Sequence, residues 1–448
     1  IVLIASEIGG NLTLTSGAAA GITDTGTVTV AGNLVATTDA NNGVINLGTI
    51  AVTGTVTLTT NGSGNATVDN GTTALKIAAS SIGGNLTVTS GDSITDSGVI
   101  TVAGTASFTT DISDKPITLN NQNAITGQVT FDTTGTGGDV TFDNGTTAIN
   151  LGVVSGGDIG GDLTLLTDAD QTISNAITLN GSGADLSITV DNANSLTIQA
   201  ALTTNAGDIT LSADDDVIFT AAGDLTSGNG NITVKADDDS TSDASSGGAL
   251  TMVDGTILNA GSGTITGTSD EDLTLGQMTT TNSTTAAITL ESKSGNILDG
   301  GDTDEDITAA SGTVVVTTGG SFGTTANEIE ITSADFNDTG VSDPVVALTT
   351  AEETLEGSNE TVGEASVDQT INIVENLIGT VEQGNQIVAG NSGSTVSAGV
   401  NTDLPGTDPF IVDVYSESYE LVKTEAGDTQ IAPAIKQLND LWLDEEDN

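Results

Sequence analysis

The segment ITLSADDD (Ile209–Asp216) recurs as ITVKADDD (Ile232–Asp239), at an offset of 23 in the numbering. In both copies apolar residues alternate with Thr, Ser or Lys, which is the period-two pattern of a β-strand with one buried face. The aspartates that follow are typical of a turn. Because like charges repel, a triplet of carboxylates that recurs in register requires an architecture that brings the same turn back at a fixed interval.

The same spacing extends along most of the chain. Strand-like runs in its middle begin at a constant spacing of 23, at Val140, Leu163, Leu186, Ile209 and Ile232, and weaker copies begin at Ile265, Ile288 and Val314. Nearer the first residue the spacing is 22. A longer block is also duplicated at an offset of 74, because NGTTALKI at Asn70 returns as NGTTAINL at Asn144. A fixed period in the low twenties, with several short strands in each repeat, is typical of a solenoid.

We therefore predict an all-β fold, a parallel β-helix (β-solenoid) of 22–23-residue coils. Strands of successive coils would stack into three sheets. About fifteen coils at a rise of ~4.8 Å each would make a rod roughly 70 Å long. The alternative is an array of antiparallel β-sandwiches, which needs longer periods and usually a core Trp or Tyr. The chain has only seven Phe, two Tyr and one Trp, which favours the β-helix.

The repeat pattern stops near Pro344, and we predict three parts: a shaft over residues 1–345, an acidic connector over 346–403 and a tail over 404–448. In the connector, the apolar residues of VDQTINIVENLIGTVEQG fall on one helical face. A short helix there would cap the open end of the solenoid. The sequence of the tail predicts a strand followed by a helix.

The charge of the chain limits its partners. It has 61 acidic residues against six lysines, no arginine and no histidine, and its formal net charge is −55. Phosphate backbones and anionic membranes repel such a polyanion, so we predict no nucleic-acid partner. No apolar run is long enough for membrane insertion. Cations should gather on the chain.

The aspartates that open this section are candidate ligands of Ca²⁺, which prefers carboxylate and turn carbonyl oxygens. Each neighbouring pair in such a column would cost about 1 kcal/mol in bulk water and about 3 kcal/mol at an effective dielectric constant of about 20. The simpler interpretation is a set of solvated turns, and it is favoured because the glycine–aspartate nonapeptide of calcium-binding repeats does not recur. The candidates are Asp168, Asp191, Asp214, Asp215, Asp216, Asp237, Asp238 and Asp239.

We predict that the protein is not an enzyme. Without histidine or arginine, the commonest proton shuttles and anion-binding forks are missing. A pair of acids could still cleave a glycoside. However, NTD at Asn401 lies outside the repeats, and the other elements of the polygalacturonase pattern do not occur. No serine elbow, zinc signature or phosphate loop is present. We predict that the protein requires no cofactor. Ca²⁺ is the one ion for which the sequence offers candidate ligands.

The serial motifs GGNLTLTSG, AGDITLSAD and GNGNITVKAD resemble the repeat region of filamentous-haemagglutinin-like exoproteins, large surface adhesins of Gram-negative bacteria. The resemblance covers roughly residues 1–337 and rests on the style of the repeat. It implies a right-handed β-helix shaft, export across the outer membrane and a role in adhesion at the cell surface. The amino-terminal secretion domain of that family is not recognisable here.

Our first hypothesis is an extracellular structural subunit that assembles end to end into a surface filament, with itself as partner. The strand-like PFIVDVY (Pro409–Tyr415) could add to the exposed coil edge of a neighbouring copy. The alternatives are that the tail folds back on its own shaft, or that the chain is a monomeric adhesin stalk that meets surface glycans. The residues assigned to self-assembly are Phe410, Val412, Val414, Tyr415, Tyr419, Leu438, Leu441 and Trp442.

Overall fold

The computed structural model describes residues 1–237, 248–301, 304–324 and 328–339, and the backbone of five short strands beyond them. The chain divides into two compact units. One comprises Ile1–Gly320 with Ser333–Gly340, and the other comprises Ser321–Thr332 with Val341–Asn448. Both segments for which the sequence predicts a helix lie outside the described residues. The described part of the chain contains strands and no helix.

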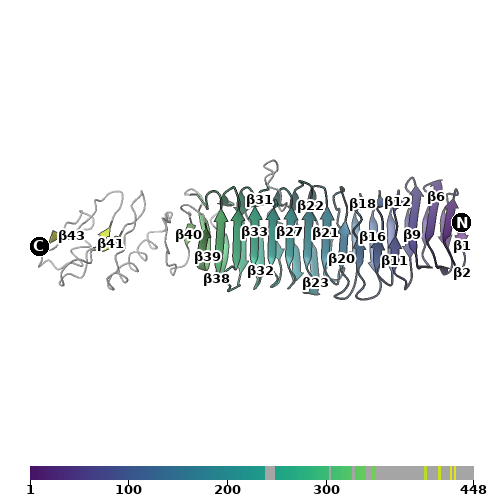
Figure 1. Cartoon of the computed structure of the whole chain (residues 1–448), viewed down its shortest axis with the longest axis horizontal. Coiled ribbons are helices and arrows are strands. Elements are labelled where there is room, and N and C mark those ends of the chain that lie inside the picture. The colour runs from purple at the N-terminus through teal and green to yellow at the C-terminus, as the bar shows by residue number, and fades with distance from the viewer. Residues whose placement is uncertain are drawn as a thin grey trace. The chain divides into compact units, whose positions relative to one another are not determined.

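The first unit is a parallel β-solenoid of about fourteen coils, about 23 residues apart, which confirms the predicted fold. Figure 1 shows its strands side by side in one continuous row, from β1 in purple to β38 in green. Equivalent strands of successive coils pair in parallel and in register, as Ile209 does with Ile232. Each coil is therefore bonded to the coil before it and the coil after it.

Most coils contribute three short strands, one to each column. The first column of the N-terminal coils contains β1 (Val2–Leu3), β4 (Ile22–Asp24), β7 (Ile45–Leu47), β10 (Ala66–Asp69), β13 (Leu86–Ser90), β16 (Ala106–Thr110) and β19 (Val129–Asp132). The other columns of the first three coils contain β2 (Ser6–Ile8), β5 (Val28–Val30) and β8 (Ile50–Val52), and then β3 (Leu12–Ser16), β6 (Leu34–Asn41) and β9 (Thr55–Asn61).

The longest column starts beside β9 and continues to the end of the shaft. It contains β11 (Leu75–Ile77), β14 (Ile94–Asp96), β17 (Ile117–Leu119), β20 (Val140–Asp143), β21 (Leu163–Thr167), β24 (Leu186–Val190), β27 (Ile209–Ala213), β30 (Ile232–Ala236), β33 (Ile265–Ser269), β36 (Ile288–Ser292) and the second half of β38 (Ile307–Thr318). A short column beside it contains β12 (Ser80–Ile82), β15 (Ile100–Val102) and β18 (Ala124–Ile125).

Two further columns run only through the later coils. One contains β22 (Gln171–Ile173), β25 (Leu196–Ile198), β28 (Val217–Phe219), β31 (Leu250–Met252), β34 (Leu273–Leu275) and β37 (Ile297–Asp299). The other contains β23 (Ile177–Ser182), β26 (Leu202–Asn205), β29 (Leu225–Thr226), β32 (Ile257–Gly261), β35 (Gln277–Thr280) and the first half of β38. β39 (Ile329–Thr339) pairs with β40 (Val346–Leu348) after them.

The core is a set of ladders of small aliphatic side chains. Burial alternates along most strands, so that in β24 Leu186, Ile188 and Val190 are buried while Ser187 and Thr189 face outward. Stacking places similar side chains of successive coils next to one another, and each interior ladder consists mainly of Val, Ile and Leu. One aromatic cluster interrupts the pattern where β16, β19 and β20 meet. There Phe131 lies 5.8 Å from Phe108 and 5.4 Å from Phe142, measured between ring centroids.

The arrangement of columns changes at two places, and the duplicated NGTTA motif marks both. At the first, the column that ends with β8 is closed by the Asn70 side chain. Its Oδ1 accepts the Val52 N–H at 2.7 Å, and its Nδ2 donates to the Val52 carbonyl at 3.1 Å. At the second, Asn144 makes the same pair of bonds with Ile125, the last residue of β18. Each asparagine side chain thus makes the two hydrogen bonds that the backbone of a paired strand in the next coil would otherwise make.

An insertion interrupts the regular spacing between β30 and β33. The spacing between equivalent positions is 33 here instead of 23, yet Ile232 pairs with Ile265 in register. Residues 238–247 lie outside the described residues, and the two residues that flank them are in contact. A Cβ placed on Gly248 would overlap the backbone nitrogen of Asp237. Asp237 and Gly248 therefore lie side by side on the coil.

We expect a chain lacking residues 238–247 to melt within about 2 °C of the wild type, because the deletion restores the regular spacing of 23 and removes none of the described strand pairings. Circular dichroism of the two chains measures this. A deletion of residues 211–220 has the same length but removes paired strand, and it should lower the melting temperature strongly. Equal losses from both deletions would contradict the expectation.

Candidate functional site

The aspartates singled out in the sequence lie at the ends of consecutive strands. Asp168, Asp191, Asp214 and Asp237 directly follow β21, β24, β27 and β30. The last residues of these strands pair in sequence along the shaft, Thr167 with Val190, Val190 with Ala213 and Ala213 with Ala236. The four aspartates therefore follow equivalent positions on four successive coils. Asp238 and Asp239 lie outside the described residues.

The triplet after β27 is tied to the coils on both sides of it. Asp214 accepts the Asn192 N–H at 2.7 Å, and Asp215 accepts the Ser195 hydroxyl at 2.7 Å, both from the preceding coil. Asp216 accepts the Ala249 N–H at 2.9 Å from the following coil. All three side chains are only partly exposed. Hydrogen bonds from neighbouring coils therefore stabilise carboxylates that would otherwise only repel one another.

The last described member of the column also has a partner. The Lys293 ammonium lies 3.6 Å from a carboxylate oxygen of Asp237, which is 7% exposed. Among the described residues no group of three or more acidic side chains converges to hold a metal ion. The assignment of Ca²⁺ to these aspartates remains a prediction.

A second acidic column, which the sequence reasoning missed, stands directly before the strands. The carboxylate of Asp139 accepts the N–H of Asp162 at 3.0 Å, and this pattern continues through the next three coils. The successive acceptors are Asp162, Asp185 and Asp208, which accept from Asp185, Asp208 and Asn231 at 2.9, 2.7 and 2.7 Å. The signal was present in the sequence, because an Asp or Asn precedes each of these strand starts.

Asparagine forms the same ladder elsewhere. Asn11 and Asn33 accept from the N–H groups of Asn33 and Thr55, and Asn231 accepts from Thr264. An amide oxygen can therefore replace the carboxylate without loss of the intercoil bond. The acidic ladder is consequently a structural device, since each side chain bridges two coils through an N–H that the strand pairing does not use.

Burial shapes the charge of the shaft. It raises the pKa of Asp132, Asp143 and Asp162 above the ordinary value of 3.8, and nearby carboxylates raise it further in each case. For Asp162 those neighbours are Asp139 and Asp185 of the ladder. Asp92 is the opposite case, because the Ser93 N–H and Lys115 lower the pKa of its exposed carboxyl group.

We expect the shaft to become more stable as the pH falls from neutral towards the ordinary aspartate pKa of 3.8, in low salt. The three raised pKa values mean that the folded chain binds more protons than the unfolded chain just above that value, so stability falls as the pH rises through the folded values. Melting temperature against pH, kept above the isoelectric point of about 4.1, measures the effect. The variant Asp132→Asn/Asp143→Asn/Asp162→Asn should show a flatter profile, and an unchanged profile would contradict the assignment.

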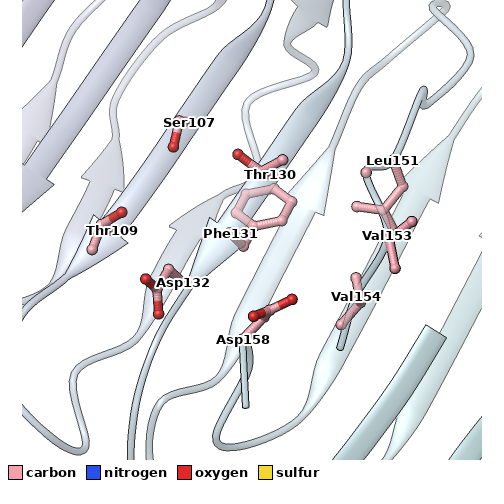
Figure 2. Close-up of a pocket in the computed structure, with 10 residues that line it drawn as sticks. Ser107, Thr109, Thr130, Phe131, Asp132, Leu151, Val153, Val154 and Asp158 are labelled. Atoms are coloured by element: carbon pink, nitrogen blue, oxygen red, sulfur yellow. The ribbon is translucent and has the colours of Figure 1, made fainter. Parts of the chain in front are cut away.

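A cleft lies beside β19, at the second change of columns. Its volume is about 260 Å³, and its lining comes from β16, from β19 and from the irregular segment that follows β20. In that segment only Leu151 and Val154 form strand-like bridges, to Val129 and Ile177. Figure 2 shows Phe131 at the centre of the cleft, with Asp132 and Asp158 on one side of it. The cleft thus exists because one coil lacks a regular strand.

Both ionisable groups that line the cleft are carboxylates. Asp158 accepts the Ser155 N–H at 2.7 Å, which holds its side chain across the turn. Burial raises the pKa of Asp132, and the charges of Asp158 and Asp111 add to that effect. The sequence analysis did not single out this pair, because the two aspartates are not spaced by the repeat. Only the fold brings them to one cleft.

The residues assigned to self-assembly are described only in part. Val412 and Val414 belong to β42 (Val412–Val414), which pairs antiparallel with β41 (Ala398–Val400) of the same chain. Their side chains are not described, and the remaining six lie outside the described residues: Phe410, Tyr415, Tyr419, Leu438, Leu441 and Trp442. Within the described part of the chain, no helix has the length and apolar character that crossing a membrane requires.

Comparison with known protein families finds a match within the solenoid. Residues 63–132 match the model of a family described as repeats of unknown function (DUF5649). The matched stretch begins just before β10 and ends with β19, so it lies wholly within the solenoid. No curated protein and no solved structure matches the chain. The fold and the match together describe a β-helical repeat protein.

Proposed function

We propose that the chain is an extracellular structural protein, a β-solenoid subunit that assembles end to end into a surface filament through its C-terminal tail. The observation that carries the proposal is the continuity of the shaft. Coil after coil pairs in register from β1 to β38, and the two changes of columns are closed by Asn70 and Asn144 rather than left open. Such a body resists bending because every coil is bonded on both faces.

The outer surface supports the same function. One outward position carries a hydroxyl side chain on nine consecutive coils, from Thr95 on β14 to Thr289 on β36. Short β-branched side chains suit a flat sheet surface. The formal net charge of −55 keeps such rods apart laterally, which favours contact at the ends. The resemblance to filamentous-haemagglutinin-like exoproteins supports a place at the surface of a Gram-negative cell.

A second candidate is a monomeric adhesin stalk that belongs to a larger exoprotein and meets surface glycans. The observation that favours it is the pairing of β42 with β41 of the same chain. In this arrangement residues 412–414 already pair with a strand of their own chain. In the filament hypothesis they would pair with a strand of a neighbouring copy instead. In both candidates the shaft is a spacer and catalyses no reaction.

Negative-stain electron microscopy tests the first candidate. The full chain and a chain without residues 404–448 would be imaged at the same concentration, each with Ca²⁺ and with a chelator. We expect long fibres from the full chain and single rods roughly 65 Å long from the truncated chain, given about fourteen coils at ~4.8 Å each. Single rods from both would overturn end-to-end assembly and leave the stalk. Fibres that survive the truncation would remove the tail from the contact.

A further inference from the structure

The cleft beside β19 has no evident role in a spacer. A shaft gains nothing from a break in one of its faces, since the missing strand leaves apolar side chains unprotected. Val153 is 60% exposed there, directly beside the buried Val154. The segment that forms this wall is held in place by the bridges of Leu151 and Val154. The cleft is therefore a built feature of the coil.

The size of the cleft limits its ligand. A volume of about 260 Å³ accommodates roughly eight or nine water molecules at ~30 Å³ each. Pockets for drug-sized ligands are usually larger, about 300–1,000 Å³. A compact ligand of a few heavy atoms, or the end of one side chain, is the appropriate size. A folded partner or an oligosaccharide would need more surface than this cleft offers.

The walls of the cleft have two characters. On β16 and β19 the side chains of Ser107, Thr109 and Thr130 present hydroxyl groups. On the opposite side Leu151, Val153 and Val154 present methyl groups, as Figure 2 shows. A ligand that fills the cleft should therefore have an apolar body and a polar end that forms hydrogen bonds with hydroxyl groups.

The charge of the cleft selects that polar end. Asp132 and Asp158 both line it, and no basic residue is among the lining residues. Partial burial, together with repulsion from the charge of Asp158, already raises the pKa of Asp132 and so disfavours its charged form. A cation placed between them relieves the repulsion, whereas an anion would add to it. A bare divalent ion would leave the methyl-bearing wall without a partner.

We propose that this cleft binds an aliphatic ammonium group, the chemistry shared by short diamines and the lysine side chain. The ammonium group lies at Asp132 and Asp158, donating to their carboxylates and to the neighbouring hydroxyl groups. The methylene chain lies against Val153 and Val154. Binding at this cleft goes beyond the proposed shaft function and does not depend on end-to-end assembly.

Isothermal titration calorimetry of the full chain with 1,5-diaminopentane tests the proposal, in about 0.15 M NaCl to screen non-specific counterion binding. We expect a saturable site with one ligand per chain, and no binding of 1,5-pentanediol, which has the same length without charge. Nα-acetyl-lysine methylamide serves as a second probe. Tighter binding of this probe would identify a protein lysine as the source of the ammonium group, and tighter binding of the diamine would identify a free amine.

Matched variants separate the cleft from the general negative charge of the chain. Asp132→Asn/Asp158→Asn should weaken binding about tenfold or more, because it removes both charge-assisted hydrogen bonds to the ammonium group. Asp185→Asn/Asp208→Asn removes the same charge from the ladder, where asparagine is already accepted at Asn231, and should change affinity less than about twofold. Equal losses from the two variants, or no saturable site at all, would overturn the proposal.

A third variant tests the apolar wall without touching a charge. Val153→Ser alters an exposed side chain, so it should fold like the wild type. It should weaken binding of 1,5-diaminopentane and leave the weaker binding of methylammonium unchanged, because methylammonium has no methylene chain to bury. Unchanged affinity for both amines would show that the methyl-bearing wall takes no part and would overturn the assigned pose.

Discussion

The variant Asn70→Ala should lose on the order of 4 kcal/mol of stability in the coils around Val52. The side chain is fully buried and makes four hydrogen bonds. Two of them satisfy the N–H and the carbonyl of Val52, and the others reach the carbonyls of Thr73 and Ala74. Alanine leaves the Val52 groups buried without partners, which costs about 1–3 kcal/mol for each group.

Hydrogen-exchange mass spectrometry measures this loss where it occurs. In a solenoid each coil contacts only its neighbours, so faster exchange should be confined to the coils that flank Asn70 and should not reach β27 or β30. The control is Asn46→Ala, on the outward face of β7 in the same region, which should change stability by no more than about 0.5 kcal/mol. If both variants exchange alike, Asn70 does not close the column.

The duplicated motif provides an internal repeat of the experiment. Asn144 bonds to Ile125, Thr147 and Ala148 in the same pattern, with distances between 2.8 and 3.2 Å. We expect Asn144→Ala to produce the same loss as Asn70→Ala, centred on the coils around Ile125 instead of those around Val52. A large effect at only one of the two sites would mean that the surrounding coils, and not the motif, determine the change of columns.

The variant Phe142→Ala should cost about 3–5 kcal/mol, the range for removing a buried aromatic ring. Phe142 is fully buried and stands in a ladder between Leu119 of β17 and Leu165 of β21. Its ring also contacts Phe131, at a centroid distance of 5.4 Å. A solenoid this thin has few other side chains that can move into the space, so the cavity should persist.

Chemical denaturation and hydrogen exchange together measure the effect. The matched control is Phe142→Leu, which restores the residue type of the neighbouring coils and should cost less than about 1.5 kcal/mol. Because Phe131 lines the cleft and packs against Phe142, the alanine variant should also weaken ammonium binding. A loss below about 1 kcal/mol for Phe142→Ala would mean that the core repacks, and that the ladders are more adaptable than their burial indicates.

Much of the fold is local in origin and could be predicted without coordinates. Alternation in ITLSADDD and its recurrence at a fixed offset identify a strand, a turn and a period, and together these predict parallel coils. The structure confirms the solenoid. The chain beyond residue 345 has no such period, and the helices predicted there, the domain limits and the assignment of Phe410 to Trp442 to self-assembly remain predictions.

The candidate sites were less accessible to sequence reasoning. The sequence singles out Asp214, Asp215 and Asp216 as a cluster of charges. The structure shows that each of them accepts a hydrogen bond from a residue of a neighbouring coil. The ladder from Asp139 to Asp208 has the same regular spacing and was not recognised. A carboxylate before a strand and a carboxylate after it look alike in sequence, because the difference lies in which N–H group of the next coil it meets.

The class of architecture follows from the sequence alone, since alternation and period are properties of one coil and each coil repeats them. Where the columns end is visible only in the tertiary structure, because it depends on whether the next coil supplies a strand for β8 or β18 to pair with. Asn70 and Asn144 close those places, and the cleft of Asp132 and Asp158 opens beside the second. Register is a relation between coils, so contacts that depend on it appear only when the coils are stacked.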